Sequence, residues 1–415
     1  MLYRLLLVVL LGAAVYSEKV RYDNYQVFRV VPNTEEQVRF LYKLQNSASG
    51  FNFWNNVRHV NNPIDIMVPP HKLPEFEEIM ESLQVNYNLI IRNVQSLMDS
   101  ERRSGTPRDD FGWTDYYPLD KVNAWLDSLV EKYPSIVSSI IGGSSFEGRQ
   151  IRGVKVSYKA GNPGVFIESG IHANEWINVA TVTFILNELL TSNDTHIRNI
   201  AENFDWYIFP SVNPDGYEYT HTKDRNWRKN RRPGTICTGT DPNRNWDYYW
   251  LDEGASSDQC SESYAGSSAF SEVETRSLSE YLTSLVSKLQ VYLCFHSYSQ
   301  LLMIPYGLTH EVADNYDALV KLGNKSIQAL ARRYGTQYKF GTIHDIIYPA
   351  SGSSIDWVKK NLKIPYTFVW ELRDTGEYGM LLPADQIIPT GQETLDSVIS
   401  ILEDVQDLEK TKMTG

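Results

Sequence analysis

Hydrophobic and polar residues follow two successive regimes along the chain. Up to about residue 103, short strand-like runs are interleaved with amphipathic stretches, which predicts strands at residues 25–31, 51–54, 64–68 and 87–91 and helices at residues 34–45, 73–83 and 93–103. This arrangement is typical of a small α+β unit of the open-sandwich kind.

Beyond residue 108, continuous apolar runs alternate with longer helical patterns. The pattern predicts strands at residues 154–157, 165–168, 206–210, 291–295 and 366–370 and helices at residues 176–190, 271–289, 314–334, 355–361 and 386–408. We therefore expect one α/β domain over residues 109–415, with a mostly parallel mixed sheet covered by helices on both faces. Such folds bind ligands just beyond the carboxyl ends of their strands.

The first 17 residues have the pattern of a secretory signal peptide. Arg4 precedes the apolar run 5–15, and small residues at Ala13, Ala14 and Ser17 follow. Eleven apolar residues are too few to cross a hydrocarbon core of about 30 Å, so we expect secretion rather than a membrane anchor. The mature chain would begin near Tyr16 or Ser17.

A basic segment at residues 102–108 separates the two regimes. It contains Ser, Gly and Pro as well as Arg103 and Arg108, and such a segment should be exposed and easily cut. Residues 18–108 are then either a binding module or a removable prosegment.

Composition excludes several classes of protein. The 51 acidic against 39 basic residues give a net charge of −12, which argues against nucleic acid as a partner. Apolar residues make up 42% of the chain, too many for a disordered one. Because secretion permits disulfides, we expect a bond between Cys237 and Cys260, which flank a Gly- and Ser-rich stretch, and a buried free thiol at Cys294.

Two glycosylation sequons are present, and they begin at Asn193 and Asn324. Both lie in polar surroundings suited to a surface, so both asparagines are candidate acceptors.

Candidate metal ligands leave the apolar strands at one edge of the predicted sheet. His172 and Glu175 follow the run 165–167, and His296 directly follows the strand 291–295. Two histidines and one carboxylate are a common ligand set for catalytic zinc. His-x-x-Glu alone is a weak signal, because a Glu in the first turn of a helix is favoured by the helix dipole.

Two further groups strengthen the case for a hydrolytic site. Glu371 follows the strand 366–370 and would serve as a general base, although a salt bridge to Arg373 is the alternative. Arg244 is flanked by Asn243 and Asn245, and a guanidinium can bind a carboxylate with two hydrogen bonds.

Together these residues resemble the zinc metallocarboxypeptidases of the pancreatic carboxypeptidase A and B type. Five motifs carry the resemblance, in the order of that family: His172-Ala173-Asn174-Glu175-Trp176, Asn226-Trp227-Arg228-Lys229, Asp241-Pro242-Asn243-Arg244-Asn245-Trp246, His296-Ser297-Tyr298-Ser299-Gln300 and Glu371-Leu372-Arg373-Asp374-Thr375-Gly376. The resemblance extends over about residues 20–410 and implies a central mixed sheet of eight strands.

The resemblance also implies a role for each site residue. His172, Glu175 and His296 would bind one zinc ion per chain, Glu371 would act as general base and then general acid, and Arg228 would stabilise the oxyanion.

Substrate contacts are implied in the same way. Asn243, Arg244 and Tyr348 would bind the free C-terminal carboxylate of a peptide or protein, and Ser297 and Tyr298 would line the neighbouring subsite. The loop around Tyr348 contains Gly and Ser and is suited to closing over substrate.

The resemblance places Ile355 at the base of the pocket for the departing side chain. An apolar residue there favours aliphatic and aromatic C-terminal residues, whereas family members that remove Lys or Arg have Asp at this position. Asp356 is expected to be structural. Two departures from the pancreatic pattern bear on specificity: Asn174 stands where those enzymes have Arg, and His344 and Asp345 precede Tyr348.

Residues 18–108 resemble the family's activation peptide. We expect a trypsin-like protease to cut after Arg108 or Arg103, and we expect the product to be a secreted, monomeric, digestive enzyme.

Four alternatives are weighed against this interpretation. A catalytically silent peptide-binding protein on the same fold is disfavoured by the presence of both Glu371 and Arg228, and a carboxypeptidase with basic preference is disfavoured by Ile355. An endopeptidase of the His-Glu-x-x-His type and a serine hydrolase with a Gly-x-Ser-x-Gly turn both lack their motifs in this sequence.

Overall fold

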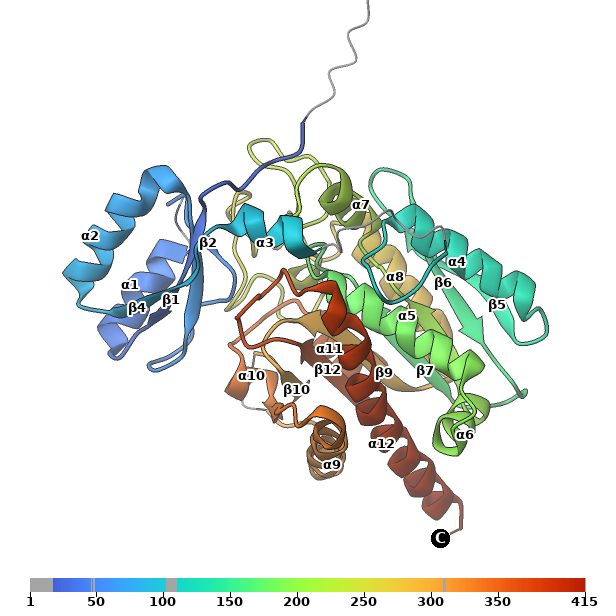
Figure 1. Ribbon diagram of the computed structural model, residues 1–415. Coiled ribbons are helices and arrows are strands. Elements are labelled where there is room, and N and C mark those ends of the chain that lie inside the picture. The colour runs from blue at the N-terminus through green and yellow to red at the C-terminus, as the bar shows by residue number, and fades with distance from the viewer. Residues whose placement is uncertain (1–17, 46, 48, 102–109, 309–310, 415) are drawn as a thin grey trace, which may run out of the picture.

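The chain forms a small N-terminal unit and a larger α/β unit (Figure 1). The computed structural model describes residues 18–414 except residues 46, 48, 102–109 and 309–310. The expected signal peptide and both expected cleavage sites, Arg103 and Arg108, therefore lie outside the described residues.

The N-terminal unit is built on a four-stranded antiparallel sheet in the order β2-β3-β1-β4. Its elements are β1 (Gln26–Val31), α1 (Glu35–Gln45), β2 (Asn52–Phe53), β3 (Ile64–Val68), α2 (Leu73–Leu83), β4 (Asn86–Ile91) and α3 (Val94–Glu101).

Alternation along the strands gives this small sheet two apolar faces. Phe28 and Ile66 pack in one cluster with Phe76 of α2, on the side that Figure 1 shows covered by α1 and α2. Val27 and Met67, one position along, belong to a second cluster that includes Tyr298, Met380 and Leu381 of the larger unit. The sheet is therefore an open sandwich whose second face is covered by the rest of the chain.

The larger unit contains an eight-stranded mixed sheet, as the resemblance implies, in the order β11-β10-β12-β9-β7-β8-β6-β5. The strands are β5 (Val137–Ser144), β6 (Gln150–Val156), β7 (Gly164–Ser169), β8 (Asp205–Phe209), β9 (Leu289–Ser297), β10 (Leu301–Ile304), β11 (Lys339–Thr342) and β12 (Tyr366–Leu372). The central strands β12, β9, β7 and β8 run parallel to one another.

Helices cover both faces of this sheet. Figure 1 shows α5 and α12 in front of it and α8 behind it. The helices are α4 (Leu119–Lys132), α5 (Trp176–Thr191), α6 (Thr195–Asn203), α7 (Pro214–Thr222), α8 (Val273–Leu285), α9 (Tyr316–Tyr334), α10 (Ile343–Ile346), α11 (Ser354–Trp357) and α12 (Ile387–Thr414). Because both faces are covered, the central strands are mostly apolar, and all residues of β7 and β8 are buried.

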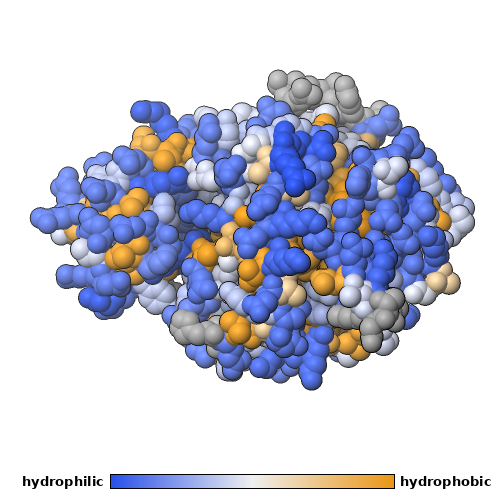
Figure 2. Space-filling view, turned by 90° about the horizontal axis from the view of Figure 1, so that it is seen from below, coloured by the Kyte–Doolittle hydropathy of each residue, from blue (hydrophilic) through white to orange (hydrophobic). Residues whose placement is uncertain are grey.

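The described part of the chain contains no helix that is both long enough and apolar enough to cross a bilayer. Figure 2 shows polar residues over most of the viewed face, with smaller apolar patches between them.

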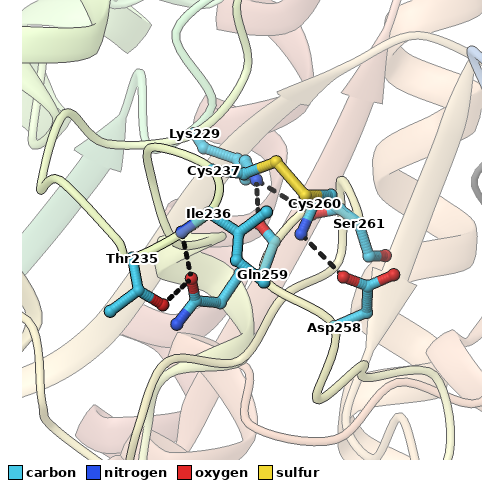
Figure 3. Close-up of a disulfide and its surroundings, with 8 residues drawn as sticks. All are labelled: Lys229, Thr235, Ile236, Cys237, Asp258, Gln259, Cys260 and Ser261. Atoms are coloured by element: carbon cyan, nitrogen blue, oxygen red, sulfur yellow. Dashed lines mark hydrogen bonds between the residues drawn. A yellow bond between two sulfur atoms is a disulfide. The ribbon is translucent and has the colours of Figure 1, made fainter.

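Cys237 and Cys260 form a disulfide that closes a surface loop (Figure 3). Lys229 reinforces the loop, because its Nζ donates to the carbonyl oxygens of Gln259 and Ser261, both at 3.0 Å. Residues 260–263 of this loop line the cleft described below, so the disulfide fixes one of its walls. Cys294 is free and buried, as expected.

Candidate functional site

Sheet topology brings the candidate residues to one edge. Strands β12 and β9 are parallel neighbours, and Glu371 is the direct register partner of His296. On the other side of β9, strand β7 ends at Ser169, three residues before His172, and Glu175 directly precedes α5. Residues up to 199 positions apart in sequence therefore meet where parallel strands end.

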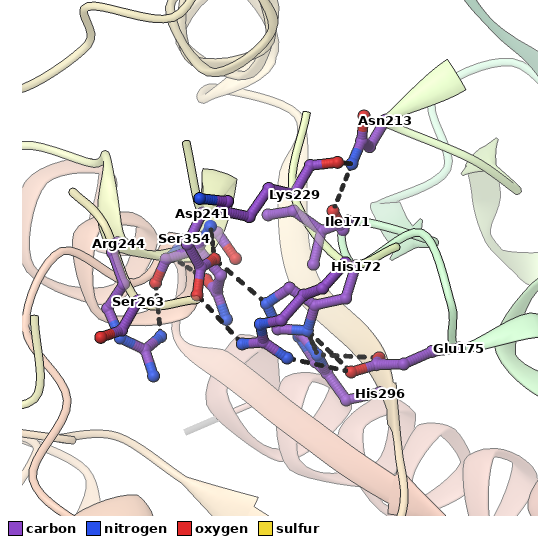
Figure 4. Close-up of polar contacts among 12 residues, drawn as sticks. Ile171, His172, Glu175, Asn213, Lys229, Asp241, Arg244, Ser263, His296 and Ser354 are labelled. Carbon is purple, nitrogen blue, oxygen red and sulfur yellow. Dashed lines mark hydrogen bonds and ion pairs between the residues drawn. The ribbon is translucent and has the colours of Figure 1, made fainter. Parts of the chain in front are cut away.

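His172, Glu175 and His296 form a buried cluster whose ligand atoms all lie within 4.8 Å of one another. The two Nδ1 atoms are 3.2 Å apart, His172 Nδ1 lies 2.8 Å from Glu175 Oε1, and His296 Nδ1 lies 3.3 Å from Glu175 Oε2. Figure 4 shows the three side chains converging on one point. Burial alone would raise the pKa of Glu175, but the two imidazoles lower it well below its usual range.

Neighbouring groups orient this cluster. Asp241 Oδ1 lies 3.2 Å from His172 Nε2, on the side of the ring away from Glu175 (Figure 4). Asn178 Nδ2 and the Ser297 backbone N–H donate to Glu175 Oε2, at 2.8 and 3.2 Å. Such partners fix the ring orientation of a ligand histidine and the position of a ligand carboxylate.

Glu371 and Arg228 face the same cleft as the cluster. Burial raises the pKa of Glu371, and the nearby Glu175 carboxylate raises it further. The Arg228 guanidinium donates to Asp241 Oδ2 at 3.0 Å and lies 3.7 Å from Glu175 Oε1. A carboxyl able to exchange protons and a fixed cation therefore flank the three candidate ligands.

Arg244 is buried beside Tyr348, and both line a pocket together with His172 and His296. Its Nη2 donates to the Tyr348 hydroxyl at 2.8 Å, and its Nε and Nη1 donate to the carbonyl oxygens of Gly254 and Asn243, at 2.9 and 2.8 Å. The Asn243 side chain accepts from the Ser354 backbone N–H at 3.0 Å. These bonds hold the guanidinium where it can meet a carboxylate.

An apolar pocket of about 50 Å³ opens between Arg244 and the candidate ligands. Ile355 is 3% exposed and lines it. Other apolar lining residues are Met303, Ile343, Ile347 and Val369, together with Cys294. Asp356 does not line the pocket; it accepts from the Gly307 backbone N–H at 2.8 Å.

The N-terminal unit covers the cleft. Asp65, fully buried in β3, is paired with Arg29 and accepts a hydrogen bond of 2.7 Å from the Tyr298 hydroxyl. Arg58 donates to the Ile346 carbonyl oxygen at 3.1 Å, and its guanidinium lies 5.7 Å from the centre of the Tyr348 ring. Two of the expected substrate-contact residues, Tyr298 and Tyr348, are thus covered by this unit.

The remaining predicted residues lie apart from these atoms. His344 and Asp345 line a separate cavity shared with Arg58 and do not line the apolar pocket. Asn193 and Asn324 are exposed, as an acceptor asparagine must be.

Comparison with known proteins places this site in a family. Residues 122–397 match the family model described as zinc carboxypeptidase, and residues 28–101 match that of the carboxypeptidase activation peptide. The chain belongs to the zinc carboxypeptidase family. It is a metallopeptidase of that family with an activation peptide, and its His-Glu-His cluster is compatible with a zinc site.

Proteins named carboxypeptidase A and carboxypeptidase B are both similar to this chain. Zinc carboxypeptidase A 1 of Anopheles gambiae is 48% identical over 94% of this chain and 91% of its own length. Carboxypeptidase B of Astacus astacus is 45% identical over 71% of this chain and 98% of its own length. The crystal structure of carboxypeptidase A from Helicoverpa armigera aligns with a TM-score of 0.83 and 27% identity, and the match covers 92% of this chain and 98% of that one.

Sequence reasoning missed the groups that support the site. Asp241 was named in the sequence only as part of a motif. An Asp directly before Pro-Asn is a candidate helix cap, and Asp241 Oδ1 accepts a hydrogen bond from the Asn243 backbone N–H at 2.8 Å. Asn178 and Arg58 gave no signal in the sequence, because each acts through a contact with a distant segment.

Proposed function

We propose that this zinc carboxypeptidase is a secreted zymogen that removes aliphatic and aromatic residues, one at a time, from the C-termini of peptides and proteins. The observation that carries the proposal is the apolar pocket beside Ile355, which Arg244 and Glu371 also line. The pocket beside Ile355 would then accept the departing apolar side chain. Arg244 would bind the free carboxylate, and Glu371 would lie near the scissile bond.

In this proposal His172, Glu175 and His296 bind one zinc ion. Two imidazoles and a carboxylate with lowered pKa, all buried, fit that ion. Bound zinc would supply Lewis acidity toward the scissile carbonyl and a water molecule.

The other residues then act on the peptide. Arg244, with Asn243 and Tyr348, holds the terminal carboxylate. Glu371 takes a proton from the attacking water on its carboxylate and delivers it to the departing amine, while Arg228 stabilises the negative charge that develops on the carbonyl oxygen. Ser297 and Tyr298 line the space for the retained part of the peptide.

Activation by a trypsin-like protease is part of the proposal, with cleavage after Arg103 or Arg108. It is supported by the contacts of Asp65 and Arg58, which leave the N-terminal unit over the cleft until it is removed. N-terminal sequencing of the trypsin-treated protein that finds a start elsewhere would overturn this part. Secretion is supported by the signal-like residues 1–17 and by the disulfide. We further expect the protein to be a monomer with a digestive role.

The test is release of the last residue from a peptide ending in Phe and from a matched peptide ending in Arg, before and after trypsin, with and without a chelator. We expect release of Phe that depends on trypsin and is lost with the chelator. Preference for Arg would overturn the pocket assignment, and no release from either peptide would favour a silent peptide-binding protein.

A further inference from the structure

Three buried polar side chains lie behind the apolar pocket and take no part in the proposed mechanism. They are Glu168, the second-last residue of β7, Tyr292 of β9 and Ser354, the first residue of α11, each at most 1% exposed. The Tyr292 hydroxyl donates to Glu168 Oε2, and the Ser354 hydroxyl donates to Glu168 Oε1 at 3.1 Å. Ser354 lines the pocket, whereas Glu168 and Tyr292 line neither the pocket nor the cleft.

A carboxyl group at the position of Glu168 is costly to bury. Burial raises its pKa, and the hydrogen bond from Tyr292 opposes that rise. An apolar residue of similar size would avoid the cost of burying a polar group. What a fully paired polar network provides instead is one fixed arrangement of its members. The contribution of Glu168 is therefore the placement of its two partners rather than apolar packing.

The first turn of α11 depends on this network. The helix has only four residues and continues as a π-helical turn at Val358–Leu362. Its cap is weak, because the Asp356 backbone N–H donates to Ser353 Oγ over 3.4 Å. So short a helix has little stability of its own and is held in place by tertiary contacts. The bond from Ser354 to Glu168 ties its first residue to the end of β7.

Ser354 also connects this network to a residue expected to bind the substrate carboxylate. Its backbone N–H donates to Asn243 Oδ1 at 3.0 Å. A backbone N–H needs an acceptor, so this bond turns the amide oxygen of Asn243 toward α11 and leaves its Nδ2 to donate to a carboxylate. Ser354, Asn243 and Arg244 all line the pocket. A shift of Ser354 would therefore release the Asn243 amide from the orientation that a carboxylate needs.

We propose that Glu168 is a positioning residue for the terminal carboxylate of the substrate. Held by Tyr292, it fixes Ser354, and Ser354 in turn fixes the Asn243 amide with its donor toward that carboxylate. The proposal rests on the carboxypeptidase function proposed above. Glu168 acts only through these neighbours, because it lines neither the pocket nor the cleft.

Two other roles for the network make different predictions. If Glu168 is purely structural, loss of its hydrogen bonds lowers the free energy of unfolding but leaves the affinity of the folded protein for a carboxylate unchanged. If Ser354 contacts the substrate directly, substitution of Ser354 weakens binding and substitution of Tyr292 does not. Variants at each position of the network separate these cases.

The test measures the dissociation constant of 3-phenylpropionate, a carboxylate with an apolar ring, by calorimetry on the zinc-loaded protein after trypsin treatment. Ser354→Ala and Glu168→Leu should each weaken binding by roughly threefold to tenfold, as for one net hydrogen bond, and Tyr292→Phe should weaken it in the same direction. Combining Tyr292→Phe with Ser354→Ala should add nothing, because Tyr292 acts through Ser354. The matched control is Tyr116→Phe, which should keep the wild-type constant. Tyr116 is 4% exposed, and its hydroxyl donates to the Leu382 carbonyl oxygen at 2.8 Å.

Hydrolysis of a peptide ending in Phe gives a second readout. The carboxylate is held both before and in the transition state, so the loss should appear in KM with kcat unchanged. A lower kcat with an unchanged KM would place the effect at the reacting atoms and would overturn the proposal.

Equal affinity of the wild type and Ser354→Ala for 3-phenylpropionate would overturn the proposal, as would wild-type affinity in both Glu168→Leu and Tyr292→Phe. Zinc content and thermal unfolding show which variants fold, and if Glu168→Leu does not, Tyr292→Phe decides. Calorimetry needs no turnover, so an absence of peptide hydrolysis would count against the proposed function and not against this placement of the carboxylate site.

Discussion

At the scale of single residues, Ile355 is the position on which the proposed specificity depends. Ile355→Asp would place a carboxylate in an apolar pocket, where it needs a cationic partner. We expect the variant to lose at least tenfold in kcat/KM for a C-terminal Phe and to gain activity toward Lys or Arg, measured on matched peptides, because even one methylene group in a hydrophobic pocket accounts for roughly 10-fold to 200-fold. Ile388→Asp, at an exposed isoleucine of α12, is the control, and an unchanged profile at Ile355 would mean that the pocket lies elsewhere.

Glu371 offers a second test at this scale. Glu371→Gln keeps the size of the side chain but removes its ability to exchange a proton, so turnover should fall by at least about 100-fold. Zinc content, measured by atomic absorption, should stay at the wild-type level. An active variant would remove Glu371 from its proposed role.

Asp356 should make stability depend on pH. Burial raises its pKa in the folded chain to about 7, whereas an unfolded Asp has a pKa of about 3.9. The folded state therefore holds a proton that the unfolded state has lost, so the contribution of Asp356 is fully present below about pH 4 and is lost as the pH rises toward 7, by on the order of 1.4 kcal/mol per pH unit.

Asp356→Asn should remove this part of the pH dependence. Denaturant unfolding of the zinc-loaded wild type and the variant at pH 5 and pH 7 measures the difference, since other titrating groups are common to both. Parallel pH profiles for the two proteins would show that Asp356 is ionised in the folded state.

At the scale of elements, the strands that position the site were predictable because they are continuous apolar runs. His296 and Glu371 are the second-last residues of β9 and β12, and His172 lies three residues after the end of β7. Their place at the ends of the predicted strands made all three residues candidates. Strands β5, β10 and β11 were missed, together with helices α4, α6, α7 and α10. Strand β5 is an edge strand that is largely exposed, without regular alternation, and has a register shift near Gly143, and β10 and β11 have only four residues each. Such elements depend on their neighbours more than on a local pattern.

Helix α3 carries the contact that holds the N-terminal unit near the expected cleavage segment. Its last residue, Glu101, is buried and forms two hydrogen bonds with Arg225, which also lies 3.8 Å from the centre of the Trp176 ring. Removing one partner of a buried ion pair typically costs about 3–5 kcal/mol. Glu101→Gln should therefore speed the release of the N-terminal unit after trypsin cleavage, and size-exclusion chromatography over time measures that release. Exposed Glu81→Gln in α2 is the control, and equal release rates would show that this pair does not retain the unit.

At the scale of the whole molecule, the two units share one apolar interface beside the cleft. Val27 and Met67 of the small sheet pack with Tyr298, Met380 and Leu381 of the larger unit. This interface could not be predicted from the sequence of either unit alone. The second apolar face of the small sheet is buried only by residues of the larger unit. The N-terminal unit therefore both buries an apolar patch and covers residues expected to bind substrate.

Arg58 tests whether that cover limits the activity of the intact chain. Its side chain is partly buried between the units, donates to the Ile346 carbonyl oxygen and lies over Tyr348, and desolvation lowers its pKa. Arg58→Ala should open the mouth of the cleft and raise the hydrolysis of a short blocked dipeptide by uncleaved protein several-fold. After trypsin treatment and removal of the N-terminal unit, the variant and the wild type should have the same kcat/KM, because the altered residue is gone. Arg39→Ala, at an exposed arginine of α1, should change neither activity. If Arg58→Ala leaves the uncleaved protein as slow as the wild type, the inhibition comes from the apolar interface and the Asp65–Tyr298 contact instead.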